Sequence, residues 1–157
     1  ALTCAPDLSF HDKMVKLMRT KSLHEIAADA TVEKCYDRSC RNRENALDNF
    51  SSNITLKTET ALLADLRSKS IRRERFAPFY LNPKIHYAIT LLPTRAGVHI
   101  TVASNPWNRP QSDLHLGELM KEYGGGGHLG VGGCNPPDEQ TAISWGHAIF
   151  KKIEDLH

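Results

Sequence analysis

The sequence lacks a long hydrophobic run and a large net charge, and each absence excludes a class of protein. No stretch of its 157 residues approaches the roughly 18 consecutive apolar residues of a membrane-spanning helix. The net charge of +2 excludes a strongly polybasic nucleic-acid-binding surface by composition, although a local basic patch is compatible with it. No signal-peptide pattern opens the chain. We therefore expect a cytoplasmic protein with no membrane partner.

The chain also has few cysteines, and they do not form a metal-ligand pattern. Cys35 and Cys40 are five positions apart, and no second pair accompanies them as a zinc site would require. Free thiols in a reducing cytoplasm are the simpler interpretation.

Hydrophobic periodicity divides the chain into a helical part and a mixed part. Three helix starts are expected in the first third, with Ser9 and Thr31 as N-caps and Ser22-Leu23-His24-Glu25 as a capping box. Period-two alternation then predicts strands over 54–58, 85–92, 98–102 and 131–134, with a further candidate at 61–66. Helices are predicted over 116–123 and from Asp138 or Thr141 onward. The fold class predicted is α+β: a small mixed sheet with flanking helices over 54–157, preceded by a helical connector arm over 1–53.

Glycine is concentrated in one short region. Eight of the ten glycines lie between Gly117 and Gly133, and four are consecutive, Gly124 to Gly127. One glycine suffices to end a helix, so the excess indicates a backbone that must approach something closely. Successive exposed N–H groups can bind an anion, and His128, which follows, can donate to a phosphate oxygen. Because the run matches neither the dinucleotide fingerprint nor the P-loop, a flexible turn is an equal alternative.

A family resemblance favours the phosphate-binding interpretation. The run from Glu118 to Tyr123 leads into Gly124-Gly125-Gly126-Gly127-His128 and then Gly132-Gly133-Cys134. This pattern resembles the C-terminal substrate-binding, or DHH-associated, domain of the DHH-family phosphoesterases. That family includes nanoRNA and cyclic-dinucleotide phosphodiesterases and exopolyphosphatase-like proteins. Asn108-Arg109 resembles a pair in the exopolyphosphatase-like branch, and the segment 6–50 loosely resembles its helical connector.

The resemblance implies that this chain holds a phosphorylated substrate: a short oligonucleotide, a nucleoside phosphate or polyphosphate. The expected substrate-binding residues are Gly124, Gly125, Gly126, Gly127, His128, Arg109, Asn108 and Ser104. In the family, a separate N-terminal lobe holds manganese through aspartates and histidines that include an Asp-His-His motif. This sequence has no such motif. We therefore predict no catalytic residue, metal ligand or cofactor in this chain, and expect manganese in a missing catalytic lobe.

The sequence departs from the family pattern at two places. After His128 the family continues with a small or basic residue and then Ala-Gly, whereas this chain has Leu129-Gly130-Val131. A Ser-Ile-Phe-like stretch upstream is replaced by Ser104-Asn105-Pro106-Trp107. These departures concern the details of substrate contact.

Three features have alternative interpretations. The helical arm from Leu8 to Phe50 could make the chain a docking or dimerisation module without direct substrate contact, with the missing lobe or a second copy as partner. The basic segment Arg67 to Arg75 could follow a nucleic-acid backbone, although a solvated linker is the commoner outcome. Trp107 could stack on a base, although packing is the commoner role.

Overall fold

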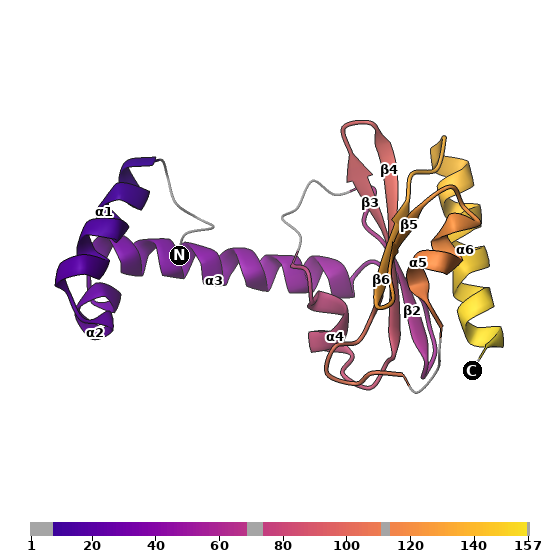
Figure 1. Ribbon diagram of the computed structural model, residues 1–157, viewed down its shortest axis with the longest axis horizontal. Helices are drawn as coiled ribbons and strands as arrows, with labels where there is room; N and C mark the ends of the chain where they lie inside the picture. Colours follow the sequence, from indigo (N-terminus) through magenta and orange to yellow (C-terminus); the bar gives the residue numbers. More distant parts are fainter. Residues whose placement is uncertain (1–7, 69–73, 111–113, 157) are drawn as a thin grey trace. The chain divides into compact units, whose positions relative to one another are not determined.

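The structure, a computed structural model, describes residues 8–68, 74–110 and 114–156, and has two compact units, Ala1–Ala46 and Leu47–His157 (Figure 1). The first unit contains α1 (Leu8–Thr20), α2 (Leu23–Ala27) and most of α3 (Ala30–Ser51). Its small core consists of Phe10, Ile26, Val32 and Cys35, with Met14 and Leu17 packed against them. No helix in the described ranges is long and apolar enough to cross a membrane.

Three N-terminal helix caps were predicted in the first unit. The structure confirms one of them and contradicts the other two. At Ser22 the capping box is complete, since Ser22 Oγ accepts from the Glu25 N–H and Glu25 Oε2 accepts from the Ser22 N–H. The prediction of Ser9 is wrong, because α1 already begins at Leu8. The prediction of Thr31 is also wrong: Asp29 Oδ1 accepts from the backbone N–H groups of Thr31 and Val32. A carboxylate satisfies these N-terminal donors at least as well as a threonine hydroxyl does.

The second unit is built on one six-stranded mixed sheet with the order β1-β2-β3-β4-β6-β5. The strands are β1 (Ile54–Lys57), β2 (Ala61–Asp65), β3 (Tyr87–Thr94), β4 (Gly97–Ser104), β5 (Gly126–His128) and β6 (Val131–Cys134). The helices are α4 (Ala77–Leu81), α5 (Leu116–Lys121) and α6 (Glu139–Asp155). β2 and β3 pair in parallel and the other neighbours are antiparallel. The predicted α+β class is confirmed, and α4 lies in the crossover that a parallel pair requires.

The sheet is covered on both faces (Figure 1). Alternate residues of β3 and β4, such as Ile89 and Ile100, belong to a core that includes residues of α5 and α6. The intervening residues, such as Ala88, belong to a second core with Phe79 of α4 and Phe50 near the end of α3. Because side chains alternate along a strand, this arrangement leaves β3 buried on both faces. Asp138 rather than Thr141 caps α6, since Asp138 Oδ1 accepts from the Thr141 N–H at 2.7 Å.

The glycine run is not a continuous loop. Gly126, Gly127 and His128 form β5, an edge strand that pairs antiparallel with β6 and places Gly127 opposite Gly132. This corrects the prediction of a loop through Gly127. The helical pattern over 116–123 also ends earlier than predicted, at Lys121.

The glycines allow α5 to lie directly on the backbone of the β5–β6 hairpin. A Cβ atom on Gly117 of α5 would lie 2.5 Å from the carbonyl carbon of Gly127. A Cβ atom on Gly132 would lie 2.7 Å from the Leu116 carbonyl oxygen. Real Cβ atoms do not come this close, so both positions require glycine at this separation. The close approach predicted from the sequence is therefore at least partly an approach between two segments of this chain.

Two alanine substitutions test this packing. Gly132→Ala should lower the free energy of unfolding by about 1–3 kcal/mol, because the added methyl group must push α5 away from the hairpin. Gly126→Ala is the matched control, since it adds the same methyl group to the same hairpin with no atom within 4 Å. Its effect should stay within about 0.5 kcal/mol. Urea denaturation measures both, and equal losses would contradict the packing account.

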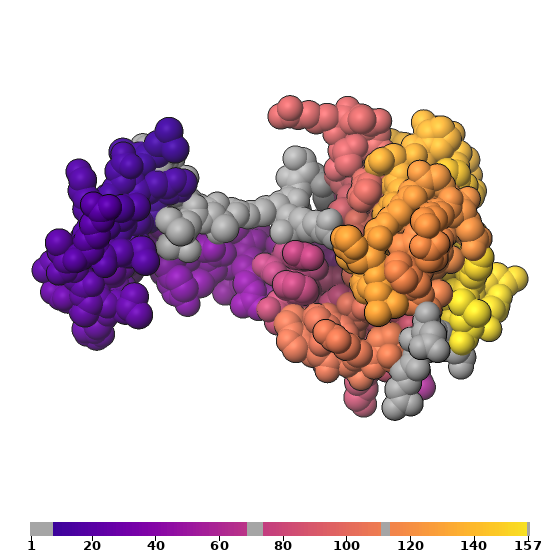
Figure 2. All heavy atoms as spheres, viewed as in Figure 1, coloured from indigo at the N-terminus to yellow at the C-terminus, as the bar shows by residue number. Residues whose placement is uncertain are grey.

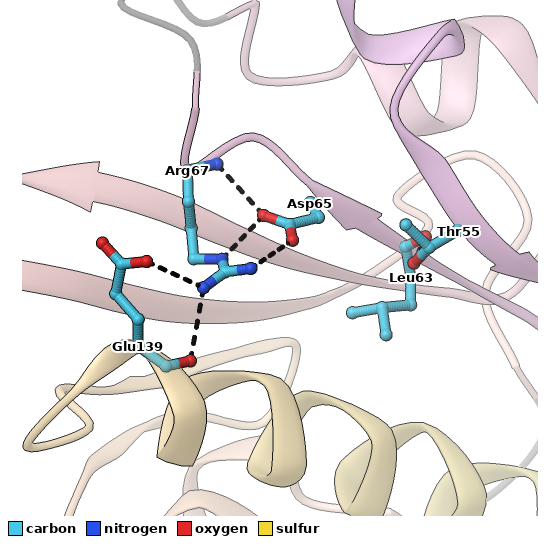
Figure 3. Close-up of polar contacts among 5 residues, drawn as sticks. All are labelled: Thr55, Leu63, Asp65, Arg67 and Glu139. Atoms are coloured by element: carbon cyan, nitrogen blue, oxygen red, sulfur yellow. Dashed lines mark hydrogen bonds and ion pairs between the residues drawn. The ribbon is translucent and has the colours of Figure 1, made fainter.

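Arg67 joins the end of β2 to the start of α6, as Figure 3 shows. Its Nη2 atom lies 2.7 Å from Asp65 Oδ2, its Nε donates to Asp65 Oδ1, and its Nη1 lies 3.4 Å from Glu139 Oε2. The hydrogen bond from Arg67 holds the pKa of Asp65 below its ordinary value of 3.8. Arg67 is thus part of the fold, whereas Lys69, Arg72 and Arg73 of the predicted basic segment lie outside the described residues.

Replacing this arginine should reduce stability in a pH-dependent way. Arg67→Met should lower the free energy of unfolding by about 1 kcal/mol at neutral pH, since the pair is only partly shielded from solvent. Because the folded-state pKa of Asp65 is depressed, the pair stabilises fully above about pH 3.8 and less as the pH falls through that pKa. The difference in free energy of unfolding between wild type and Arg67→Met should therefore decrease as the pH falls below about 3.8. Lys121→Gln, which breaks an exposed pair with Glu118, should have little effect at any pH.

Candidate functional site

A pocket of about 960 Å³ lies in the second unit, beside α4. Its lining comes from four parts of the chain: the start of α4, strands β3 and β4, the loop after β4, and the turn of the β5–β6 hairpin. These residues are Arg75, Phe76, Phe79, Tyr87, Thr101, Ala103, Ser104, Pro106, Arg109, Pro110, Leu114, Leu129, Gly130 and Val131. In Figure 2, α4 and the segment after β4 lie on the face in view. The volume suits a nucleotide-sized ligand.

The charge of this pocket is positive. Arg75 and Arg109 contribute guanidinium groups, and no acidic side chain belongs to the described lining. Planar guanidinium groups match the oxygens of a phosphate with two parallel hydrogen bonds. The Ser104 hydroxyl donates to the Gly130 carbonyl at 3.2 Å, and the Ser104 N–H donates to the same oxygen at 2.9 Å. These bonds hold the hairpin turn against the end of β4.

The loop that delivers Arg109 is held by one buried side chain. Asn105 is fully buried, and its Nδ2 donates to the carbonyls of Pro83 and Ile85 at 3.1 and 2.8 Å. Its Oδ1 accepts from the N–H groups of Trp107 and Asn108 at 3.0 and 3.2 Å. All the hydrogen-bonding positions of the amide are therefore used within the protein. A fixed loop loses little further conformational entropy when a ligand binds.

The structure brings two of the predicted side chains, Ser104 and Arg109, into the pocket. Asn108 does not belong to its described lining: Asn108 Nδ2 donates to the Lys84 carbonyl at 2.7 Å, and the Asn108 carbonyl accepts from His86 Nδ1 at 3.2 Å. Asn108 therefore supports the loop. His128 is exposed at the end of β5 and immediately precedes Leu129 and Gly130, which do line the pocket.

The glycine amides are partly engaged by the fold. Gly124 donates to the Lys121 carbonyl at 3.0 Å, and Gly125 donates to the Met120 carbonyl at 2.9 Å. Gly124 has φ +68°, as the residue that ends a helix often has. Gly126 and Gly127 belong to β5. The predicted series of four free amide donors is therefore reduced, and the pocket lies at the other end of the hairpin.

Sequence reasoning missed Arg75 and the turn residue Gly130. Arg75 was grouped with a basic segment because its neighbours along the chain are basic. Its position in the lining of the same pocket as Arg109 depends on the crossover between β2 and β3, which no local pattern reveals. A local indication that the end of this basic segment packs against the fold was Phe76, an apolar residue directly after it.

The other reactive groups nearby have structural roles. Burial raises the pKa of the Cys134 thiol to about 11, so this cysteine is protonated and unreactive at neutral pH. His115 Nδ1 accepts from the Glu118 N–H at 3.1 Å and so caps α5. Within the described ranges, no three or more His, Cys, Asp or Glu side chains gather as a metal site would require.

Comparisons with known proteins identify the fold. The sequence matches no protein-family model and no curated protein. The structure is similar to the pGpG-specific phosphodiesterase PggH from Vibrio cholerae, with a TM-score of 0.81 and 19% identity over 96% of this chain and 52% of that one. It is also similar to an exopolyphosphatase-related protein from Bacteroides fragilis, with a TM-score of 0.55 and 14% identity over 96% of this chain and 45% of that one. The chain shares their fold and spans about half their length.

Proposed function

We propose that this chain is the phosphate- and nucleotide-binding C-terminal domain of a DHH-type phosphoesterase, and that it does not hydrolyse its substrate alone. The observation that carries the proposal is one pocket lined by Arg75 and Arg109, which come from separate segments, and by Ser104. The family resemblance in the sequence supports it, and so do the names of the two neighbours, a phosphodiesterase and an exopolyphosphatase-related protein. The substrates of both kinds of enzyme carry phosphate.

The residues of this chain would bind and orient the substrate. The guanidinium groups of Arg75 and Arg109 would neutralise phosphate charge on the substrate and donate paired hydrogen bonds to phosphate oxygens. His128, at the end of β5, would donate to a phosphate oxygen where the ligand extends past the hairpin turn. In the proposed parent enzyme, manganese held by a second lobe would supply the activated water that hydrolysis needs. The connector arm over 1–53 would join that lobe to the substrate-binding domain.

A charge-matched pair of variants tests the pocket. Arg109→Gln should weaken binding of tripolyphosphate and of a 5′-phosphorylated diribonucleotide by about tenfold or more, because one charged donor is lost. Arg95→Gln makes the same charge change at the exposed turn after β3, outside the described lining. Its effect should stay within about twofold. Isothermal titration calorimetry measures both, and failure of the wild-type chain to bind either ligand would overturn the proposal.

The role of His128 is tested separately. His128→Ala should weaken binding of the diribonucleotide severalfold, because one ring N–H donor to a phosphate oxygen is lost. Equal affinities in wild type and variant would remove His128 from the site and leave the arginine pocket as the site.

A second candidate function is docking or dimerisation through the first unit. Leu8, Val15 and Met18 of α1 are each more than half exposed. Their spacing of seven and three residues places them on one face of the helix. Phe10 and Met14, on the other face, pack in the core of this unit. α1 therefore carries exposed large apolar side chains on a face that the described part of the first unit does not cover, as a partner-binding helix would.

Analytical ultracentrifugation tests the dimer form of this hypothesis. The wild-type chain should associate as its concentration rises, and the double variant Val15→Gln, Met18→Gln should remain monomeric because its exposed apolar face is lost. Lys16→Gln, an exposed change on the same helix, should associate as wild type does. A wild-type chain that is monomeric at all concentrations would contradict a homodimer.

A further inference from the structure

We infer that Phe76, Tyr80 and Trp107 form a stacking surface for a nucleobase beside the arginine pocket. The ligand of that pocket is then a nucleotide unit, in a nucleoside phosphate or a short oligonucleotide, rather than inorganic polyphosphate. This inference rests on the proposed function and identifies the class of its substrate.

The three rings form a compact cluster. The ring centroids of Phe76 and Trp107 are 5.3 Å apart, those of Tyr80 and Trp107 are 5.2 Å apart, and those of Phe76 and Tyr80 are 6.4 Å apart. These separations are typical of interacting aromatic side chains. The rings come from α4, from the residue before it and from the loop after β4, so the tertiary fold brings them together.

The cluster is exposed, although its members are large and apolar. Trp107 is 60% exposed and Tyr80 is 46% exposed. Tryptophan is usually well buried, and an exposed group of apolar rings is typical of a binding surface. A packing role alone does not explain why the larger of these two rings is the more exposed.

The exposed tryptophan is also fixed in position. The buried Asn105 side chain accepts from the Trp107 N–H at 3.0 Å and is itself anchored on the carbonyls of Pro83 and Ile85. Asn108, the next residue, is tied to the Lys84 carbonyl. The loop therefore holds an apolar ring in solvent with a rigid backbone, which reduces the entropy lost when a flat ligand stacks on it.

The rings and the charges are contiguous. Phe76 contacts Trp107 and also lines the pocket, and the Arg75 guanidinium carbon lies 5.4 Å from the Phe76 ring centroid. On the other side, Pro106 lines the pocket and directly precedes Trp107. One ligand can therefore place a phosphate in the arginine-lined pocket and a flat ring on the aromatic cluster. Nucleotides have both groups, whereas polyphosphate has no apolar face that could cover the rings.

The experiment compares two ligands on the same variants. Wild type, Trp107→Leu and Trp107→Phe are titrated with a 5′-phosphorylated diribonucleotide and with tripolyphosphate. Trp107→Leu should lower the affinity for the diribonucleotide by about tenfold, because one stacking ring is lost. Binding of tripolyphosphate should change by less than about twofold, since it tests the arginines alone. Trp107→Phe retains a ring and should recover most of the affinity.

A fluorescence measurement reports the stacking itself. The chain has two tryptophans, and Trp145 packs against Tyr123 in the core region. In a Trp145→Phe background, Trp107 is the sole tryptophan, and its emission should be quenched by the diribonucleotide and unchanged by tripolyphosphate. The same titration of Trp107→Phe, which retains Trp145, should show no quenching.

The outcomes separate this inference from the proposed function. If wild type binds neither ligand, the proposed function fails and the stacking surface fails with it. If wild type binds tripolyphosphate while Trp107→Leu leaves the diribonucleotide affinity unchanged, the stacking surface is overturned and the phosphate pocket stands. If Trp107→Leu lowers the affinities for both ligands by the same factor, Trp107 has a structural role in the pocket. That result also overturns the stacking surface.

Discussion

The second unit depends on a contact between two backbones. α5 lies so close to the β5–β6 hairpin that side chains on Gly117 and Gly132 would collide with the opposite main chain. The hydrogen bond from the Leu116 N–H to the Leu129 carbonyl joins the start of the helix to the hairpin turn. The same turn is bonded to Ser104 through the Gly130 carbonyl. The turn is thereby held at the edge of the pocket, so the shape of the site depends on the absence of side chains at Gly117 and Gly132.

This contact explains both what the glycine pattern predicted and what it left open. An excess of glycine means that the backbone approaches something closely, and this is a local property that a sequence shows. What it approaches depends on long-range packing. Gly117 and Gly132 are required by the packing of α5 on the hairpin, and Gly127 by the close approach of β5 to β6 within it. The amides of Gly124 and Gly125 end α5. The anion donors proposed for this domain come mainly from the side chains of Arg75 and Arg109.

Features determined by neighbouring residues were predictable, and features determined by distant ones were not. The capping box at Ser22, the hairpin of β3 and β4 and the Asp138 cap each depend on residues within a few positions. The strand β5 was missed because its three residues have no apolar alternation and form a strand by pairing with β6. Arg75 was missed because only the crossover between two parallel strands brings it to the pocket that Arg109 also lines. The aromatic cluster likewise joins residues about thirty positions apart.

The hydrogen bonds of Asn105 fix the main chain of the loop after β4, whereas the side chains of the residues that follow it line the pocket and the aromatic cluster. The four hydrogen bonds of Asn105 involve main-chain atoms, so they do not depend on the side chains that follow it. The side chains at positions 106, 107 and 109 take no part in these bonds. Under the proposed function, exchange of these side chains would change the ligand of the domain while the main-chain frame stays the same.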